Sequence, residues 1–292
     1  MIEERPLGGS GIHTSALGMG CSRLGSLLAD GGLRCATRAV EAALEEGIRF
    51  FDTADIYAQG DSERVLGRVA AGLDTVTIAT KAGYRLPAPR WTIRLVKPPL
   101  RWAARLRRGI NRSIAARRRE GFRQDFAPNH LRQALHGSLR RLRRERIDVF
   151  FLHNPPPTLA ETDALWRFVE DARRAGALRS FGISCAGDDL DAAWLNHAAV
   201  EIAQVPLGSA SPHFLAAARE RGVGIVAREL LGGRCRATEI EAALREAFDH
   251  PAVSVALLGM SRSEHVRANA ALARRVAEGP AHALAPAVAR RA

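Results

Sequence analysis

The chain has 292 residues, of which 47% are hydrophobic, and it carries a formal net charge of +12. This composition suits one large hydrophobic core, and no run of 18 or more apolar residues predicts a membrane-spanning helix. The N-terminus lacks the apolar stretch of a signal peptide, and the four scattered cysteines form no CxxC motif. We therefore expect a reduced, cytoplasmic protein without a metal site.

The net charge is confined to one segment. Residues 85–123 contain thirteen basic residues and a single acid, Glu120, so this segment alone carries the charge of +12. The remainder of the chain is formally neutral. The overall charge therefore says little about the fold and does not by itself predict a nucleic-acid-binding protein.

A glycine-rich turn within residues 1–14 predicts a β-hairpin. From residue 15 onward, short apolar runs alternate with helical patterns, and the runs are apolar on both faces, as parallel strands buried on both sides are. The predicted strands cover 15–19, 48–52, 75–80, 147–152, 179–184, 201–206, 223–228 and 253–259. The predicted helices cover 34–47, 61–71, 128–145, 159–175, 188–199, 212–221, 238–249 and 263–276.

Several of these helices have clear start signals. Pro128 suits a first turn, the segment 238–241 (Thr-Glu-Ile-Glu) predicts a capping box, and Ser263 opens the last helix. Eight strands alternating with eight helices predict a (β/α)8 TIM barrel in a single domain over 1–292, with a flexible tail over 277–292. A doubly wound open sheet is the alternative, but Gly18 and Gly20 are not followed by the third glycine of a GxGxxG turn.

Four polar residues fall at the ends of predicted strands. Asp52 closes the apolar run at 48–52, and Tyr57 follows five residues later. Lys81 follows the third strand and His153 follows the fourth. Each alone is more often structural or a solvated surface residue. Because the carboxyl ends of parallel strands share one rim of a barrel, we expect the four side chains to meet there.

These four residues, in this order, resemble the catalytic tetrad of the aldo-keto reductases, and the resemblance covers 5–82 and 126–276. It implies that Tyr57 is the acid–base group, that Lys81 and Asp52 tune it, and that His153 orients the substrate. A neighbouring ammonium favours a phenolate, so we expect Lys81 to lower the pKa of Tyr57. The implied activity is hydride transfer between a nicotinamide and an aldehyde, ketone, sugar or alcohol.

The resemblance also implies a site for NADP, with NAD the less favoured cofactor. Arg228 stands where the family often has an aromatic residue on the nicotinamide, and Arg262 with His265 would pair with a 2′-phosphate at a helix N-terminus. The implied cofactor-binding residues are Gly20, Ser184, Gln204, Arg228, Leu231, Gly233, Gly259, Ser261, Arg262, His265 and Asn269.

Three residues depart from the family pattern. Cys185 replaces an asparagine that would hold the carboxamide, Ala58 stands where glycine often follows the tyrosine, and Glu229 replaces a common serine near the pyrophosphate. An acid at 229 would repel that group. These departures leave open the alternative of an NADP-binding regulatory subunit without significant turnover.

The basic segment 85–123 has several interpretations. It falls where the family has a loop over the substrate pocket, so it could be a lid whose arginines recognise an acidic substrate. Its mixture of tryptophan, leucine and arginine also suits contact with a membrane surface, and phosphate contacts to nucleic acid are a less favoured reading. An arginine-rich insertion without a partner is equally compatible. The sequence does not indicate the substrate or the oligomeric state.

Overall fold

The barrel strands are apolar on both faces because side chains cover them from inside the barrel and helices cover them from outside. The computed structural model describes residues 1–25, 32–86, 123–185, 192–233 and 236–279. Within these ranges, eight parallel strands close into one barrel, in which the last pairs with the first. In order around the barrel they are β3 (Leu17–Gly20), β4 (Phe50–Asp52), β5 (Thr77–Ala82), β8 (Ile147–His153), β9 (Leu178–Ser184), β10 (Ile202–Pro206), β11 (Gly224–Arg228) and β12 (Val253–Gly259). The predicted TIM barrel is confirmed.

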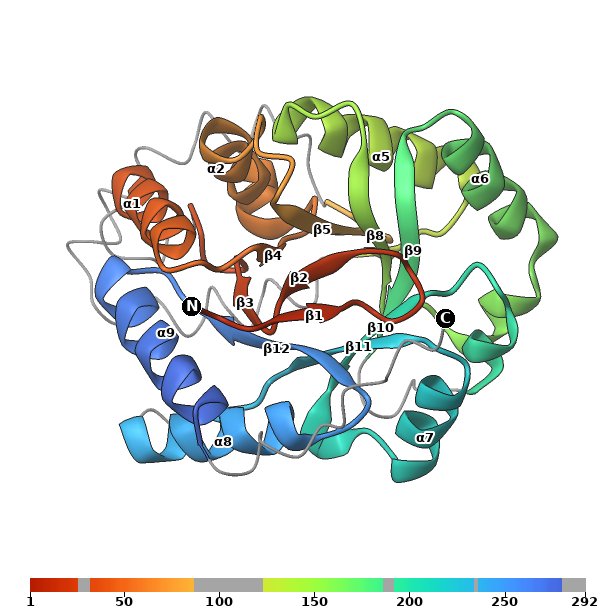
Figure 1. The fold of residues 1–292 in the computed structure, drawn as a ribbon. Coiled ribbons are helices and arrows are strands. Elements are labelled where there is room, and N and C mark those ends of the chain that lie inside the picture. The colour runs from red at the N-terminus through yellow and green to blue at the C-terminus, as the bar shows by residue number, and fades with distance from the viewer. Residues whose placement is uncertain (26–31, 87–122, 186–191, 234–235, 280–292) are drawn as a thin grey trace, which may run out of the picture.

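Helices surround the strands (Figure 1). In the described residues the α-helices are α1 (Gly32–Glu45), α2 (Asp61–Val69), α5 (Pro128–Leu142), α6 (Asp163–Arg174), α7 (Pro212–Glu220), α8 (Ala237–Asp249) and α9 (Ser263–Ala277). The predicted helix over 188–199 lies partly outside the described residues, and its described part forms the 3-10 helix η4 (Ala192–Asn196). A further 3-10 helix, η2 (Pro157–Glu161), precedes α6, which therefore begins later than predicted.

The helix starts follow the predicted signals with one exception. Pro128 occupies the first turn of α5, and Ser263 opens α9. Helix α8 begins at Ala237, so the capping box predicted over 238–241 is wrong. The backbone N–H of Arg236 donates to the Glu239 carboxylate at 3.0 Å instead, which moves the cap two residues toward the N-terminus.

The predicted N-terminal hairpin is confirmed and closes one end of the barrel. Strands β1 (Glu4–Pro6) and β2 (His13–Ser15) pair antiparallel and lie across the barrel in Figure 1. Leu7 and Ile12, between them, join the apolar cluster inside the barrel. Gly8 has a φ of +56°, and a Cβ there would lie 2.2 Å from the backbone nitrogen of Gly224 at the start of β11. The opposite end, where the strands terminate, is left for the polar residues.

Alternation along the strands decides which side chains face the barrel interior. The inner cluster contains Phe50, Ala79, Phe151, Ile202 and Val226. Successive strand side chains point to opposite faces, so the residue two places further on faces inward as well. Those residues are Asp52, Lys81, His153, Gln204 and Arg228. Five separate strands thus deliver a polar side chain to the same end of the barrel interior.

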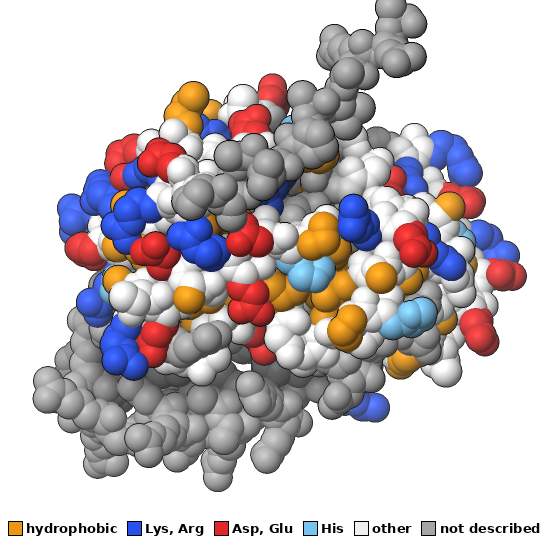
Figure 2. Space-filling view, turned by 60° about the horizontal axis from the view of Figure 1, so that its bottom comes forward, with side chains coloured by type: hydrophobic (Ala, Val, Ile, Leu, Met, Phe, Trp, Pro, Cys, Tyr) orange, Lys and Arg blue, Asp and Glu red, His pale blue; other side chains and the backbone are white. Residues whose placement is uncertain are grey.

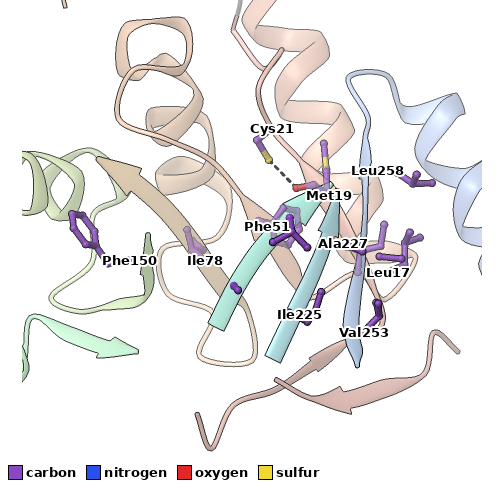
Figure 3. Packing of buried hydrophobic residues seen from close by; sticks show 14 of the residues in the cluster. Leu17, Met19, Cys21, Phe51, Ile78, Phe150, Ile225, Ala227, Val253 and Leu258 are labelled. Carbon is purple, nitrogen blue, oxygen red and sulfur yellow. Dashed lines mark hydrogen bonds between the residues drawn. The ribbon is translucent and has the colours of Figure 1, made fainter. Parts of the chain in front are cut away.

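The intervening residues form the second and larger apolar layer, between the strands and the helices. Figure 3 shows Leu17, Met19, Phe51, Ile78 and Phe150 in this layer. All five are fully buried. Successive residues of a strand pack in different layers, one inside the barrel and the next against the helices. A shift of one residue would therefore bury the polar residues of the strand ends in the outer layer.

The described ends of the basic insertion pair with each other beside the barrel rim. β6 (Tyr84–Arg85) and β7 (Arg123–Gln124) form a two-stranded antiparallel sheet. Residues 87–122 lie outside the described residues, so the lid, membrane-surface and nucleic-acid interpretations of the insertion remain predictions. Helix α9 ends at Ala277, and the predicted flexible tail falls largely on residues 280–292, which are not described. No helix in the described ranges is long and apolar enough to span a membrane.

We expect Gly182→Ala to destabilise the barrel strongly. A Cβ at Gly182 in β9 would lie 2.1 Å from the backbone oxygen of Ile202 in β10, and neither strand can move without disturbing its neighbours. The free energy of unfolding in urea should fall by about 3 kcal/mol, the upper end of the usual cost of overpacking. Gly72→Ala is the control because a Cβ there meets nothing within 4 Å, and a substitution at 182 that behaved like it would contradict this packing.

Candidate active site at the carboxyl ends of the strands

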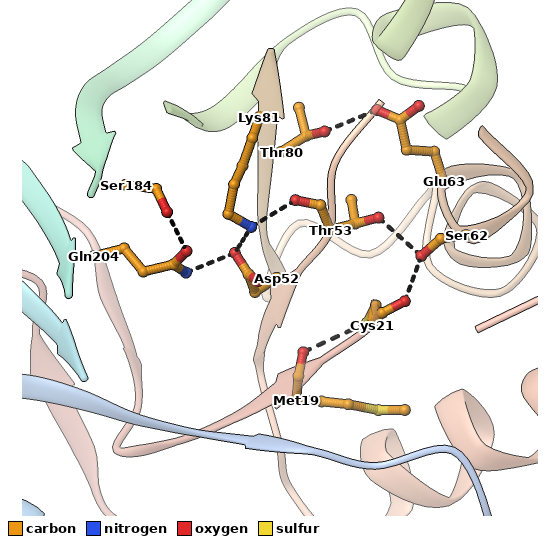
Figure 4. Close-up of polar contacts among 10 residues, drawn as sticks. All are labelled: Met19, Cys21, Asp52, Thr53, Ser62, Glu63, Thr80, Lys81, Ser184 and Gln204. Carbon is orange, nitrogen blue, oxygen red and sulfur yellow. Dashed lines mark hydrogen bonds and ion pairs between the residues drawn. The ribbon is translucent and has the colours of Figure 1, made fainter. Parts of the chain in front are cut away.

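A buried ion pair lies at the centre of the polar cluster. Lys81 is 1% exposed, and its Nζ donates to Asp52 Oδ1 at 2.5 Å and to the backbone oxygen of Thr53 at 2.9 Å (Figure 4). The third side of the ammonium faces Tyr57, with Nζ 5.1 Å from the ring centroid. Strands β4 and β5 are hydrogen-bonded neighbours, which fixes the two ends of the pair relative to each other.

Tyr57 is placed by a tight turn after β4. It opens the 3-10 helix η1 (Tyr57–Gly60), in which Ala58 and Gln59 have φ values of +48° and +58°. These left-handed conformations favour glycine, so Ala58 introduces local backbone strain. The turn leads directly into α2, whose first turn carries Asp61 and Glu63.

His153 lies edge-on between the two tyrosines of the chain. Its ring centroid is 6.1 Å from that of Tyr57 and 5.0 Å from that of Tyr84, with interplanar angles of 87° and 86°. The Nδ1 atom of His153 is buried and has no hydrogen-bond partner. The side chain of Asn154, which follows, donates to the hydroxyl of Tyr84 at 3.2 Å.

Burial governs the protonation of this cluster. It raises the pKa of Tyr57, and although the charge of Lys81 acts in the lowering direction, it does not outweigh burial. Lys81 thus acts on the pKa of Tyr57 in the expected direction, but the net shift is upward because of burial. Burial alone would lower the pKa of Lys81, but Asp52 and Tyr57 raise it, so the ammonium stays charged. Burial, with Lys81 and Arg228, lowers the pKa of His153 to about 3.

A chain of hydrogen bonds joins the ion pair to the next strands. Ser184 Oγ donates to Gln204 Oε1 at 2.8 Å, and Gln204 Nε2 donates to Asp52 Oδ1 at 2.8 Å (Figure 4). Both residues are almost fully buried. The two residues predicted to hold a carboxamide are thus already fixed to the carboxylate that holds Lys81.

A second buried network lies behind the ion pair. Ser62 Oγ donates to the backbone oxygen of Cys21 at 2.9 Å and is 2.8 Å from the Thr53 hydroxyl. Thr80 donates to the fully buried carboxylate of Glu63 at 2.8 Å. Ser62 and Glu63 have no role in the sequence-based predictions beyond membership of the predicted helix over 61–71. Both are polar and follow Asp52 closely in the sequence. That is the one signal that could have indicated a role in supporting the site.

Two cavities open at this end of the barrel. One, of about 410 Å³, is lined by Asp52, Tyr57, His153, Ser184, Gln204 and Arg228, among others. The second, of about 760 Å³, runs between the β12–α9 connection and the loop after β11. The two share Gly20, Ser22, Glu229, Leu257 and Gly259, so they form one continuous hollow. An elongated ligand with one end at Tyr57 and the other at α9 would fit it.

The structure brings nearly all of the predicted cofactor residues to this hollow. The 760 Å³ part is lined by Gly20, Leu231, Gly233, Gly259, Ser261, His265 and Asn269. Arg262 does not line it and is exposed at the N-cap of α9. Lys81 lies beneath the hollow. Three polar lining residues were missed because nothing in their local sequence marks them: Ser22, Arg23 and Asn154.

Two of the departures from the family pattern contact each other through Arg228. Its Nη2 donates to the backbone oxygen of Cys185 at 2.8 Å, and its Nη1 forms an ion pair with Glu229. Glu229 has a φ of +58°, which turns its carboxylate back toward the arginine. The negative charge of Glu229 is thereby neutralised rather than left to face the hollow alone.

A model of the Aldo/keto reductase family matches residues 16–240. The chain belongs to the aldo/keto reductase family. A 6-dehydroglucose reductase from Novosphingobium aromaticivorans is 33% identical over 206 residues, covering 66% of this chain and 54% of that protein. The chain spans about half the length of the curated relatives it matches.

Solved structures of aldo-keto reductases share the fold. One from Bacillus halodurans, in a holo form, superposes with a TM-score of 0.70 at 24% identity, covering 93% of this chain and 91% of that one. One from Klebsiella pneumoniae, in complex with NADPH, superposes with a TM-score of 0.64 at 19% identity, covering 94% and 90%.

The low pKa of His153 predicts an acid-sensitive contribution to the stability of this aldo/keto reductase barrel. An unfolded histidine binds a proton below about pH 6.5 and the folded one only near pH 3, so this contribution is complete above pH 6.5 and is lost as the pH falls. At pH 5 the loss should be about 2 kcal/mol. The free energy of unfolding in urea should therefore differ less between pH 7 and pH 5 in His153→Gln than in the unsubstituted protein.

The exposed His136 on α5 provides the control for that measurement. His136→Gln should keep the pH dependence of the unsubstituted protein. Equal pH dependence in the two variants would mean that His153 is not held neutral by burial.

Proposed function

We propose that the protein is an NADPH-dependent oxidoreductase that reduces the carbonyl group of a small molecule, or oxidises the corresponding alcohol. The observation that carries this proposal is the ammonium of Lys81, fixed by Asp52 at 2.5 Å and facing the ring of Tyr57, with an uncharged His153 across the same cavity. Family membership supports the same class of activity.

In this proposal Tyr57 donates the proton. The phenol is protonated at neutral pH, so its proton is available to a carbonyl oxygen that gains negative charge. Burial raises the pKa of Tyr57, and the charge of Lys81 opposes that rise. Lys81 then stabilises the phenolate that forms, and Asp52 keeps Lys81 charged and in place. NADPH, when bound, supplies the hydride.

His153 contributes orientation rather than charge. A histidine with a pKa of about 3 remains neutral throughout the physiological range and can donate one hydrogen bond to a substrate oxygen. Its position beside Tyr57 would hold that oxygen within reach of the phenol. A cationic residue there would repel the Lys81 ammonium, and the neutral imidazole avoids that repulsion.

The residues of the hollow fit a nicotinamide dinucleotide. Ser184 and Gln204 present amide and hydroxyl groups beside Asp52, where a carboxamide would bind. Gly20 and Gly259, which lie in both parts of the hollow, leave the backbone open to a pyrophosphate. The N-terminus of α9 offers free N–H groups at the far end, and Arg262 beside it would favour the 2′-phosphate of NADP over NAD.

The substrate class we favour is a small polar carbonyl compound, such as a sugar derivative. The 410 Å³ cavity is lined by Asn154 and Arg228 as well as the central cluster, and these side chains suit hydroxyl groups. The relative from Novosphingobium bears the name of a reductase of such a compound. A regulatory subunit that binds NADP without turnover is the alternative, and it would have no need of the Lys81–Asp52 pair.

Tyr57→Phe should reduce kcat by about 100- to 10,000-fold because it removes the proton donor and leaves the ring in place. Binding of NADPH, followed by fluorescence, should be unchanged. Tyr84→Phe is the matched control, since it removes the other tyrosine hydroxyl, on the far side of His153, and should retain most of the activity. Undiminished turnover by Tyr57→Phe would refute the assigned role.

Arg262→Ala should weaken NADPH binding by about tenfold and leave NADH binding unchanged, because the side chain would contact only the 2′-phosphate. Fluorescence titration with each cofactor measures both affinities. Arg267→Ala removes another exposed arginine of α9, paired with Glu45, and should affect neither. An equal loss for the two cofactors would place Arg262 at the shared pyrophosphate instead.

A further inference from the structure

A separate cavity lies on the outer surface of the barrel, between α2 and α5. It measures about 570 Å³ and is lined by Arg64, Arg68, Gly137, Arg140, Arg141 and Arg143. We propose that this arginine cavity binds a small anion that carries two phosphate groups, at a site distinct from the hollow at the strand ends. The proposal is independent of the oxidoreductase activity.

Two glycines shape the packing around this cavity. A Cβ at Gly67 of α2 would lie 2.4 Å from the backbone oxygen of Arg141, so the two helices approach closely. A Cβ at Gly137 would lie 2.8 Å from Nη1 of Arg141. Without it, the guanidinium lies along α5 and reaches the fully buried Glu63. The backbone is therefore shaped to hold this arginine in a fixed position.

The cavity has more positive charge than the described carboxylates neutralise. Arg141 pairs with Glu63, and Arg64 pairs with Asp61 at 3.1 Å. Among the described residues no carboxylate pairs with Arg68, Arg140 or Arg143. Like charges held around one space repel, and an anion between them would relieve that repulsion. The concentration of charge is local because residues outside 85–123 are formally neutral.

Arg143 occupies an unusual backbone position for an arginine. It is the C-cap of α5 and has a φ of +56°, a conformation that favours glycine. Its side chain lines the arginine cavity and also an adjoining hollow of about 480 Å³, in which acids (Asp74, Glu145 and Asp148) accompany the other arginines. A backbone cost at a position that lines the arginine cavity supports a binding role for its guanidinium.

The chemistry of the lining indicates the class of ligand. Guanidinium groups bind phosphate through paired N–H···O bonds, and several around one space suit more than one phosphate group. The volume exceeds that of pyrophosphate, so a sugar carrying two phosphates would also fit. Pyrophosphate and fructose 1,6-bisphosphate are therefore the two probes that separate a free inorganic anion from a phosphorylated metabolite.

Isothermal titration of the full chain with each probe, at about 150 mM salt and with saturating NADPH, tests the proposal. We expect saturable binding of at least one probe. The exposed double variant Arg68→Ala/Arg140→Ala should weaken it at least tenfold. Arg143→Gly should weaken it as well while leaving thermal stability intact, because glycine suits the positive φ. Arg132→Ala, elsewhere on α5, is the control and should bind normally.

Two results would overturn the proposal. One is the absence of saturable binding by either probe. Binding that the cavity variants leave unchanged would count equally, because it would assign the anion to another basic segment. The other is an oligonucleotide that binds more tightly than both probes and loses affinity in the same variants. That outcome would make the surface part of a nucleic-acid interface rather than a small-anion site. Neither result depends on turnover at Tyr57.

Discussion

The ion pair between Lys81 and Asp52 is the interaction on which the site depends. Removing two charges from water costs several kcal/mol for each, and a pair in the interior is stable only if its remaining hydrogen-bonding groups are also satisfied. Here the Thr53 carbonyl takes a second donor of the ammonium, and Gln204 donates to the carboxylate. Losing one partner would leave a buried charge, at a cost of about 3–5 kcal/mol. Because separating the two charges is so costly, Lys81 and Asp52 stay in one geometry. A site that transfers a proton needs such fixed positions.

Strand alternation explains why the site was largely predictable from the sequence. Asp52, Lys81 and His153 each lie two places after an apolar residue of the inner cluster, and Tyr57 follows in the turn after β4. Barrel closure then brings the strand ends together without any further information. The strand positions, the N-terminal hairpin and the meeting of Asp52, Tyr57, Lys81 and His153 at one rim therefore followed from short-range patterns alone.

What could not be predicted depends on burial and on contacts between distant segments. The pKa of Tyr57 was expected to fall, because sequence gives the neighbouring charge of Lys81 but not the loss of water around the phenol. Glu229 was expected to repel a pyrophosphate, because only its positive φ turns it toward Arg228. The pair between Glu63 and Arg141 joins residues 78 positions apart, and no local pattern encodes it.

The choice of basic residue at position 81 follows from the same constraints. The chain has only two lysines, and elsewhere its positive charge is arginine, which is interspersed with acids on the face shown in Figure 2. Exposed arginine tolerates such surroundings because water satisfies its five donors. In the barrel interior the available partners are the Asp52 carboxylate, the Thr53 carbonyl and the Tyr57 phenol, which match the three donors of an ammonium. A guanidinium there would bury donors without partners, so an otherwise arginine-based chain requires lysine at this position.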